Sequence, residues 1–194
     1  EDSFWVLSGT FIWAPIYDKN YETPISNLFA SIRESSEFPF ALEADTVLGL
    51  FVMALIGLIA VEFIGYWAHR LQHRFMFFWR IHATHHHLTK MVWQEPIGHP
   101  LEFLGLNLGF AIALAFLGAS DEVVGVAVVI SATTGYTCHG NLPLRAGLFG
   151  WLFNTPEWHQ LHHSCNYDES NTNYGCTLII WDRVFGTFCD KDSI

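Results

Sequence analysis

The feature that most restricts the fold of this chain is a set of long apolar runs with almost no charged residues. The first begins at Thr46 and continues, interrupted by Glu62, through an aromatic stretch that ends at His69. Two more runs lie between residues 101 and 138 and are separated by the polar sequence GASDE, residues 118–122. A helix of about 20 apolar residues is long enough to cross a bilayer. We therefore predict membrane spans at about residues 46–67, 101–120 and 122–138. The alternative is a set of buried core helices in a soluble protein.

The order of these runs places two distant segments on one side of the membrane. The first span ends near His69, and the second and third spans form a hairpin that leaves the same face and returns to it. Residues 69–100 and 139–194 should therefore lie together, and they hold all 11 histidines. They also hold most of the basic residues: Arg70, Arg74, Arg80, Lys90, Arg145, Arg183 and Lys191. Basic residues near span ends favour the cytoplasm, so we expect the histidines to face the cytoplasm.

Composition supports a membrane protein and excludes one class of partner. Charged residues make up 14% of the chain, against about 25% in soluble domains. The net charge of -10 argues against a nucleic acid partner, which would need a basic face. The four cysteines form no CxxC pair, so we expect reduced thiols rather than a zinc ribbon.

The N-terminal segment, residues 1–45, differs from the rest of the chain. It is rich in acidic residues, and its apolar stretch, residues 4–17, is short for a span. We expect this stretch to lie at the membrane interface. The chain starts at Glu1 rather than Met, so we also expect that upstream sequence is missing.

Three histidine clusters indicate a metal site. HRLQH contains His69 and His73, and the pattern HxxHH occurs twice. The repeated pattern supplies His82, His85, His86, His159, His162 and His163. Spacings of three and four place side chains on one helical face, at about 100° per residue. Each cluster is therefore expected to direct its imidazoles toward one place, and eight imidazoles suffice for two metal ions.

The identity of the metal follows from which ligands are present. Imidazole suits iron, zinc and copper, and the scattered cysteines argue against an iron–sulfur cluster. Two irons held by histidines at a membrane surface suit O2 activation and oxidation of a lipid C–H bond, and zinc is a possible substitute in purified protein. The alternatives are a membrane zinc metallohydrolase and a non-catalytic metal-binding protein, although the metalloprotease motif HExxH is absent.

The motifs EFIGYWAHRLQH, HATHH, HPLE, HGNLP, TPEWHQLHHS and WDRVFGTF occur in an order that resembles the fatty acid hydroxylase / sterol desaturase superfamily. The resemblance covers residues 45–190. It implies an integral membrane oxygenase with a non-haem di-iron centre, O2 as co-substrate and a lipid substrate such as a fatty acyl chain, sterol or other isoprenoid. It assigns the eight box histidines as ligands and adds His139. Some members carry a second histidine four residues after that one, where this chain has Pro143.

The resemblance also bears on the electron supply and the cellular site. This chain shows no haem-binding segment and no thiolate cluster, so a separate donor of the cytochrome b5, ferredoxin or reductase type is implied. We expect an integral protein of the bacterial inner membrane or the endoplasmic reticulum. No catalytic residue is predicted beyond the metal ligands.

Other polar residues are candidates for supporting the ligands. Glu62 shares a helix face with His69 and is predicted to accept a hydrogen bond from an imidazole N–H. His99 is expected to support the site or begin a helix, with Glu102 as its pairing partner.

Three further residues complete the predicted set. His87 is turned about 100° past His86 around the helix, so we predict that it is not a metal ligand. It is expected to orient another side chain, contact substrate or face solvent. Asn141 is a candidate weak ligand or water-orienting group. Asn173 is expected to buttress the site.

Taken together, these patterns predict an all-α integral membrane bundle with a cytoplasmic, histidine-rich cap for two metals. Residues 46–194 form the predicted di-iron oxygenase domain, with histidine boxes in 69–87 and 139–163. The predicted activity is O2-dependent hydroxylation or desaturation of a membrane lipid.

Overall fold

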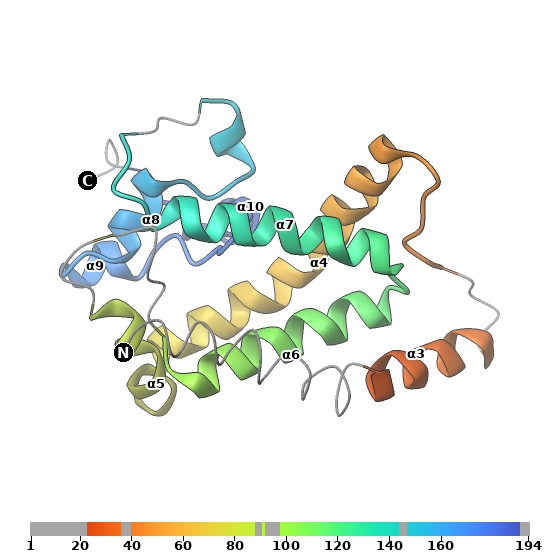
Figure 1. Ribbon diagram of the computed structural model, residues 1–194. Coiled ribbons are helices and arrows are strands. Elements are labelled where there is room, and N and C mark those ends of the chain that lie inside the picture. Colours follow the sequence, from red (N-terminus) through yellow and green to blue (C-terminus); the bar gives the residue numbers. More distant parts are fainter. Residues whose placement is uncertain (1–22, 36–39, 88–90, 92–97, 144–146, 191–194) are drawn as a thin grey trace, which may run out of the picture.

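Figure 1 shows the protein as a computed structural model. The structure describes residues 23–35, 40–87, 91, 98–143 and 147–190. Within these ranges the regular elements are helices, and the only β pairing is an isolated antiparallel bridge between Phe153 and Leu178. The prediction of an all-α fold is therefore confirmed for the described residues. Most of the acidic segment, including the apolar stretch 4–17, lies outside them.

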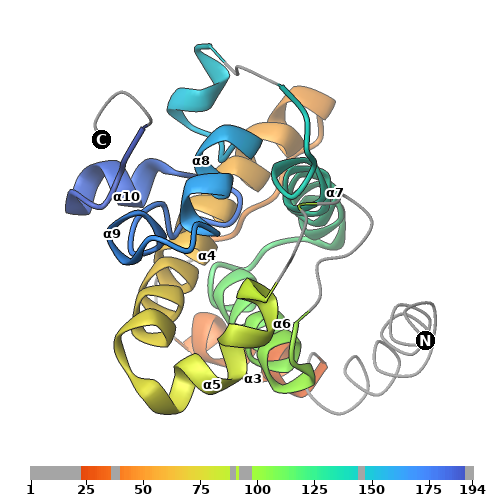
Figure 2. The ribbon, with the colours of Figure 1, turned by 90° about the vertical axis from the view of Figure 1, so that its left-hand side faces the viewer.

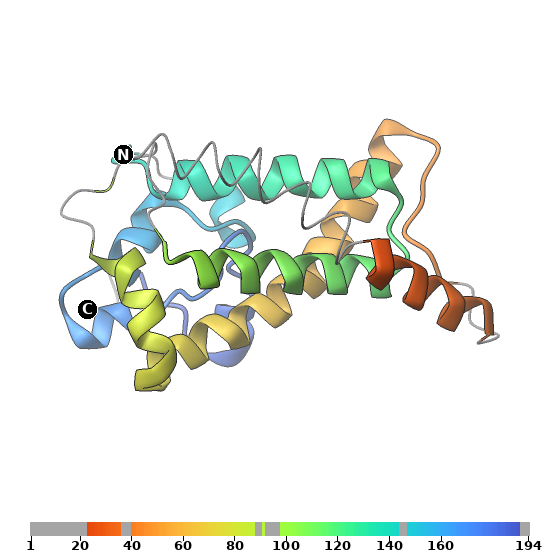
Figure 3. The same ribbon diagram turned by 60° about the horizontal axis from the view of Figure 1, so that its bottom comes forward.

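Three long helices form the body of the molecule. They are α4 (Val47–Arg74), α6 (Pro100–Phe116) and α7 (Asp121–Cys138). Helices α6 and α7 form the predicted hairpin, and α4 contacts both of them and crosses α7 obliquely (Figures 1 and 3). The three helices occupy the ranges predicted as spans, with two differences. Helix α6 ends at Phe116, before the predicted boundary at residue 120, and α4 extends about two turns further and carries the first histidine box with it.

Helix α4 is the one helix of the described residues that is long and apolar enough to cross a membrane. Helix α6 is apolar but has only 17 residues, and α7 is not apolar enough over its 18 residues to join α4 in this class. Only 22% of the most apolar part of α4 is buried. A core helix of a soluble protein would be mostly buried, so this exposure favours the membrane interpretation of α4.

Capping residues explain where the long helices begin. The Thr46 hydroxyl accepts a hydrogen bond from Gly49 N at 3.0 Å, and Ser120 caps α7 in the same way from Val123 N. Such caps satisfy backbone N–H groups that have no partner within the helix. His99 caps α6 through Nδ1, which accepts from Leu101 N.

The helices pack on a small core near the hairpin tip. Leu42, Leu58, Leu114 and Val123 are buried there. The chain before α4 adds to the tip through backbone hydrogen bonds: Leu42 N donates to the carbonyl of Gly118 at 3.1 Å, and Ser120 N donates to Leu42 O at 3.1 Å. These contacts fix how α4 lies across the hairpin.

Short helices follow α4 and α7 along the chain. They are α5 (Met76–His86), α8 (Pro156–His162), α9 (Tyr167–Ser170) and α10 (Ile180–Phe185), with the 3-10 turn η3 (Phe149–Trp151). Helices α5, α8 and α9 lie at the far end from α3 (Thr23–Ser35) and the hairpin tip (Figures 1 and 2). The histidine-bearing parts of the segments after the first and third predicted spans therefore meet at one end, as predicted. Helix α10 differs, because it packs beside the middle of α4, where Trp181 Nε1 donates to Ile59 O at 2.9 Å.

Candidate metal centre

Nine histidines converge in two groups at this end of the bundle. The larger group, which we call the five-histidine group, contains His69, His73, His82, His86 and His162. The four-histidine group contains His85, His139, His159 and His163. Within each group one ring nitrogen per residue lies within 4.8 Å of all the others. The structure thus brings together all nine histidines that the sequence analysis named as ligands.

Each HxxHH box is divided between the two groups, which corrects the expectation that one box points at one place. His82 and His86 belong to the five-histidine group, whereas His85 belongs to the other. Residues i and i+4 lie about 40° apart around a helix, but i+3 lies about 60° to the other side of i. The i, i+4 pair therefore stays together and the i+3 histidine reaches the neighbouring group. The box on α8 is divided in the same way.

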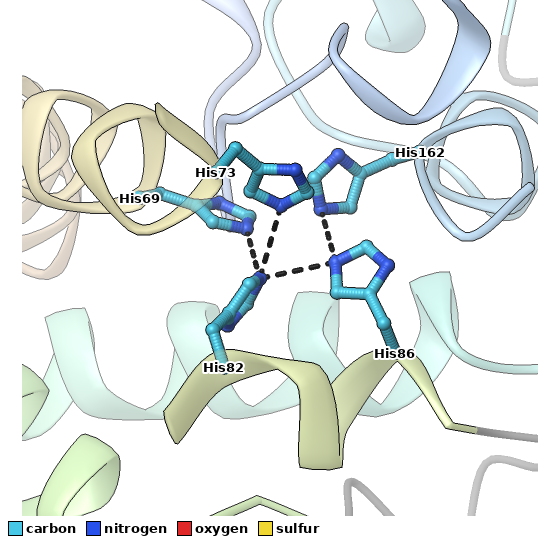
Figure 4. A group of neighbouring side chains, drawn as sticks. All are labelled: His69, His73, His82, His86 and His162. Atoms are coloured by element: carbon cyan, nitrogen blue, oxygen red, sulfur yellow. Dashed lines mark hydrogen bonds between the residues drawn. The ribbon is translucent and has the colours of Figure 1, made fainter. Parts of the chain in front are cut away.

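His82 lies at the centre of contacts in the five-histidine group (Figure 4). Its Nε2 is 2.9 Å from Nε2 of His69, 3.1 Å from that of His73 and 3.0 Å from that of His86. His86 Nε2 lies 3.1 Å from His162 Nε2. Two nitrogens that bind one metal ion at a right angle, each at about 2.1 Å, are about 3.0 Å apart. The observed separations match the edges of a coordination sphere.

The four-histidine group has the same spacing. His139 Nε2 lies 3.2 Å from His85 Nε2 and 2.9 Å from His159 Nε2. His163 Nε2 lies 3.1 Å from His159 Nε2. A group of four imidazoles leaves coordination positions open on a six-coordinate ion such as iron.

Backbone carbonyls fix which nitrogen of several rings carries the proton. Nδ1 of His69 donates to Tyr174 O at 2.6 Å, and Nδ1 of His162 donates to Thr172 O at 2.8 Å. Nδ1 of His139 donates to a carbonyl of its own helix at 2.7 Å. A carbonyl can only accept, so in the neutral rings Nε2 carries a lone pair. These lone pairs point at other imidazole nitrogens, an arrangement that a bound cation would stabilise.

Glu102 supplies a carboxyl acceptor to the five-histidine group. Its Oε1 lies 2.5 Å from Nδ1 of His82, and both side chains are buried. The carboxyl of Glu102 thus reaches the ring of His82 rather than that of His99, which caps α6, and Glu102 pairs with His99 only through the backbone, where Glu102 N donates to His99 O at 2.9 Å. The sequence offered a signal for this role: an ionisable residue in the first turn of an apolar helix is costly and usually functional.

Glu62 does not accept from an imidazole, which corrects its predicted role. Its carboxylate accepts from Cys176 N at 3.0 Å and from Thr177 N at 2.9 Å. The loop after α9 contacts both side chains: Tyr174 O accepts from the ring of His69, and the next residues donate to the carboxylate of Glu62. Glu62 instead ties that loop to α4.

Asp182 holds the same loop from the other side. It is fully buried and accepts from Tyr174 N at 2.8 Å, Gly175 N at 2.7 Å and the Thr187 hydroxyl at 2.7 Å. The loop between α9 and α10 carries the carbonyls of Thr172 and Tyr174. Asp182 therefore positions the acceptors of His69 and His162 without contacting either ring.

The remaining predicted residues have different places. Asn173 is buried, and its Nδ2 donates to Trp158 O at 3.2 Å and to Cys189 O at 2.8 Å. It therefore anchors the loop between α9 and α10, which we call the acceptor loop because its carbonyls accept hydrogen bonds from the histidines. His87 caps the end of α5, is exposed and lies outside both groups. Asn141 is exposed and also lies outside both groups. All four cysteines are free thiols.

Two aromatic side chains border the five-histidine group. The Trp79 ring centroid lies 5.2 Å from that of His73 and 5.3 Å from that of His86. Tyr174 lies 5.3 Å from His73 on another side. These rings reduce access of water to the imidazoles.

Burial keeps the imidazoles neutral. It lowers the pKa of His86 to about 3, and repulsion from neighbouring histidines adds to this effect. Burial likewise lowers the pKa of His82, His159, His162 and His163 well below the ordinary range. A neutral imidazole is the form that binds a metal, so the groups are ready to bind at neutral pH. The donor set fits iron, zinc or copper.

Comparison with known proteins places these features in a family. The sequence profile described as fatty acid hydroxylase matches residues 54–187, a range that contains all nine converging histidines. No solved structure matches the chain.

Several curated proteins resemble the chain over about two thirds of its length. Ornithine lipid hydroxylase OlsE of Rhizobium tropici is 38% identical over 69% of this chain and 41% of its own length. Alkylglycerol monooxygenase of Xenopus tropicalis is 33% identical over 67% of this chain and 29% of its own length. The human alkylglycerol monooxygenase is 29% identical over 67% of this chain and 29% of its own length. The chain thus spans less than half the length of these relatives.

Proposed function

Because this chain belongs to the fatty acid hydroxylase family, we propose that it is an O2-dependent membrane lipid hydroxylase whose two histidine groups hold two iron ions. The observation that carries the proposal is the convergence of nine imidazoles into groups with the nitrogen spacing of two coordination spheres. The proposed ligands are His69, His73, His82, His86 and His162 for one ion and His85, His139, His159 and His163 for the other. Bound iron would supply the O2 activation that oxidation of an unactivated C–H bond requires.

The protein's own residues provide orientation and a dry environment. Carbonyls of the loop between α9 and α10 fix the tautomers of His69 and His162, and Glu102 fixes that of His82. Burial keeps the rings neutral without a metal and excludes water from them. In a site of this kind the position of the lipid chain decides which bond is oxidised.

Two features favour the hydroxylase over a zinc hydrolase, the alternative from the sequence. A hydrolase needs a carboxylate base beside an open metal position, and Glu102 is bound to the far nitrogen of His82. The names of the relatives, ornithine lipid hydroxylase and alkylglycerol monooxygenase, support hydroxylation of a lipid rather than desaturation.

Membrane placement and electron supply complete the proposal. We place α4 across the membrane and the α6–α7 hairpin in it, with the histidine end facing the cytoplasm because basic residues are concentrated there. Residues 46–194 would then form the oxygenase domain. A separate donor, of the cytochrome b5, ferredoxin or reductase type, would supply the electrons.

The test is an isotope experiment in cells. Lipids from cells with and without the gene would be compared by mass spectrometry under 18O2. The proposal predicts a lipid that gains one 18O atom only when the gene is present. A purified protein that keeps zinc, and shows no O2 consumption after reconstitution with iron and a reductant, would contradict it.

A further inference from the structure

The two histidine groups are supported in chemically different ways. In the five-histidine group, one ring donates to a carboxylate and two others donate to carbonyls of the loop between α9 and α10. In the four-histidine group, His139 donates to a carbonyl of its own helix. Asn154 presents its amide nitrogen, not its oxygen, to Nδ1 of His159 at 3.3 Å.

That Asn154 amide is held in this orientation by the backbone. Its Nδ2 donates to Gly175 O at 2.7 Å, and its Oδ1 accepts from Thr155 N at 2.8 Å. Rotating the amide by 180° would place oxygen against carbonyl oxygen and nitrogen against N–H. The Nδ1 of His163 is buried and has no hydrogen-bond partner among the described residues. The four-histidine group therefore lacks, at these two rings, the acceptor that makes a neutral imidazole a better ligand.

The carboxylate of Glu102 has an uncompensated side. Its side chain is 6% exposed, and it accepts a hydrogen bond from the neutral ring of His82, itself 3% exposed. The other carboxylate oxygen, Oε2, is buried without a hydrogen-bond partner among the described residues. A buried carboxylate is costly unless a positive charge is near. A cation on Nε2 of His82, across the ring, would provide that charge.

We propose that Glu102 is a positioning residue that makes the five-histidine group the tighter of the two metal positions, so that this group fills first. This inference rests on the proposed binding of two metals. Glu102 acts through His82: it holds the proton on Nδ1, directs the Nε2 lone pair into the group and adds negative charge to the ring. The four-histidine group, without a carboxylate on the rings discussed above, binds its metal more weakly.

The experiment is an anaerobic titration of the metal-free chain in detergent with Co²⁺, whose visible absorption reports each binding step. The wild-type chain is expected to bind two equivalents in two steps. In Glu102→Gln the first step should weaken about 10- to 100-fold, while the second should stay within about threefold. Glu43→Gln, which removes an exposed glutamate charge before α4, should leave both steps unchanged.

A second variant separates charge from shape. Glu102→Asp keeps the negative charge on a shorter side chain, so its first step should lie between those of wild type and Glu102→Gln. If the glutamine variant does not fold, the expected result is a first step weaker in Glu102→Asp than in wild type, with the second step within about threefold. Equal first-step affinities in wild type and Glu102→Gln, or equal weakening of both steps, would overturn the inference. A wild-type chain that binds fewer than two Co²⁺ ions would instead contradict the proposed function.

Discussion

The acceptor loop between α9 and α10 is held by one buried carboxylate, and removing its charge should open the loop. In Asp182→Asn one carboxylate oxygen becomes an amide NH2 group. If the retained oxygen still accepts from Tyr174 N and Thr187, the new NH2 group faces Gly175 N–H, which donates to the carboxylate at 2.7 Å in the wild type. The variant therefore loses one hydrogen bond to a charged group and leaves a buried N–H unpaired.

The loss of loop stability in Asp182→Asn can be estimated from these contacts. A hydrogen bond to a charged group contributes about 1.5–3 kcal/mol, and an unpaired buried donor costs about 1–3 kcal/mol. Because these terms overlap, we expect about 3 kcal/mol of lost loop stability, or roughly a 100-fold increase in the population of the open loop. His69 and His162 would lose their fixed tautomers, so metal affinity should fall in the five-histidine group.

Hydrogen–deuterium exchange of the amides of residues 173–177, read by mass spectrometry, measures this opening directly. The matched control is Asp168→Asn, which changes an exposed aspartate on α9 and should leave exchange unaltered. Exchange in Asp182→Asn that equals the wild-type rate, together with unchanged metal affinity, would refute the role assigned to this carboxylate.

Three more predictions concern the histidines and the loop. His86→Ala should lose metal from the five-histidine group, whereas His87→Ala should keep both metals, as measured by elemental analysis; equal metal loss in both would contradict the grouping. Gly175→Ala should prevent correct folding, because a Cβ atom there would lie 2.2 Å from Leu178 O; a monodisperse variant with normal metal content would show otherwise. The third concerns pH: the pKa of His86 is about 3 in the folded protein and about 6.5 when unfolded, so the unfolded chain binds more protons between these values. The metal-free protein should therefore be at full stability above about pH 6.5 and lose up to about 1.4 kcal/mol per pH unit for each such histidine as the pH falls toward 3. A thermal unfolding midpoint that stays constant from pH 7 to pH 4 would contradict this.

The sequence was sufficient to predict the features that depend on local spacing and chain order. The apolar runs predicted α4, α6 and α7, and the hairpin explained why His82 and His162, 80 residues apart, meet at one end. The division of each HxxHH box was implicit in helical geometry, since an i, i+4 pair and an i+3 residue diverge. The division could be recognised only once the structure showed which helices supply the other histidines of each group.

The partners of the buried carboxylates could not be predicted from spacing. Glu62 and Glu102 both sit on apolar helices near the histidines, and either was a plausible imidazole acceptor. Which one reaches a ring depends on how α5 packs against α6 and on where the loop after α9 passes, and both are tertiary contacts. The partners of Asp182 were likewise not predictable from spacing, because its hydrogen bonds run to backbone groups seven and eight residues away.

The central claim is that the two histidine groups are two metal positions. The most direct measurement is the number of iron ions bound per chain after anaerobic reconstitution, with X-ray absorption of the same sample to identify the ligands. We predict two irons per chain, with ligand shells dominated by imidazole nitrogen. One iron or none per chain, or a shell without imidazole, would contradict the account.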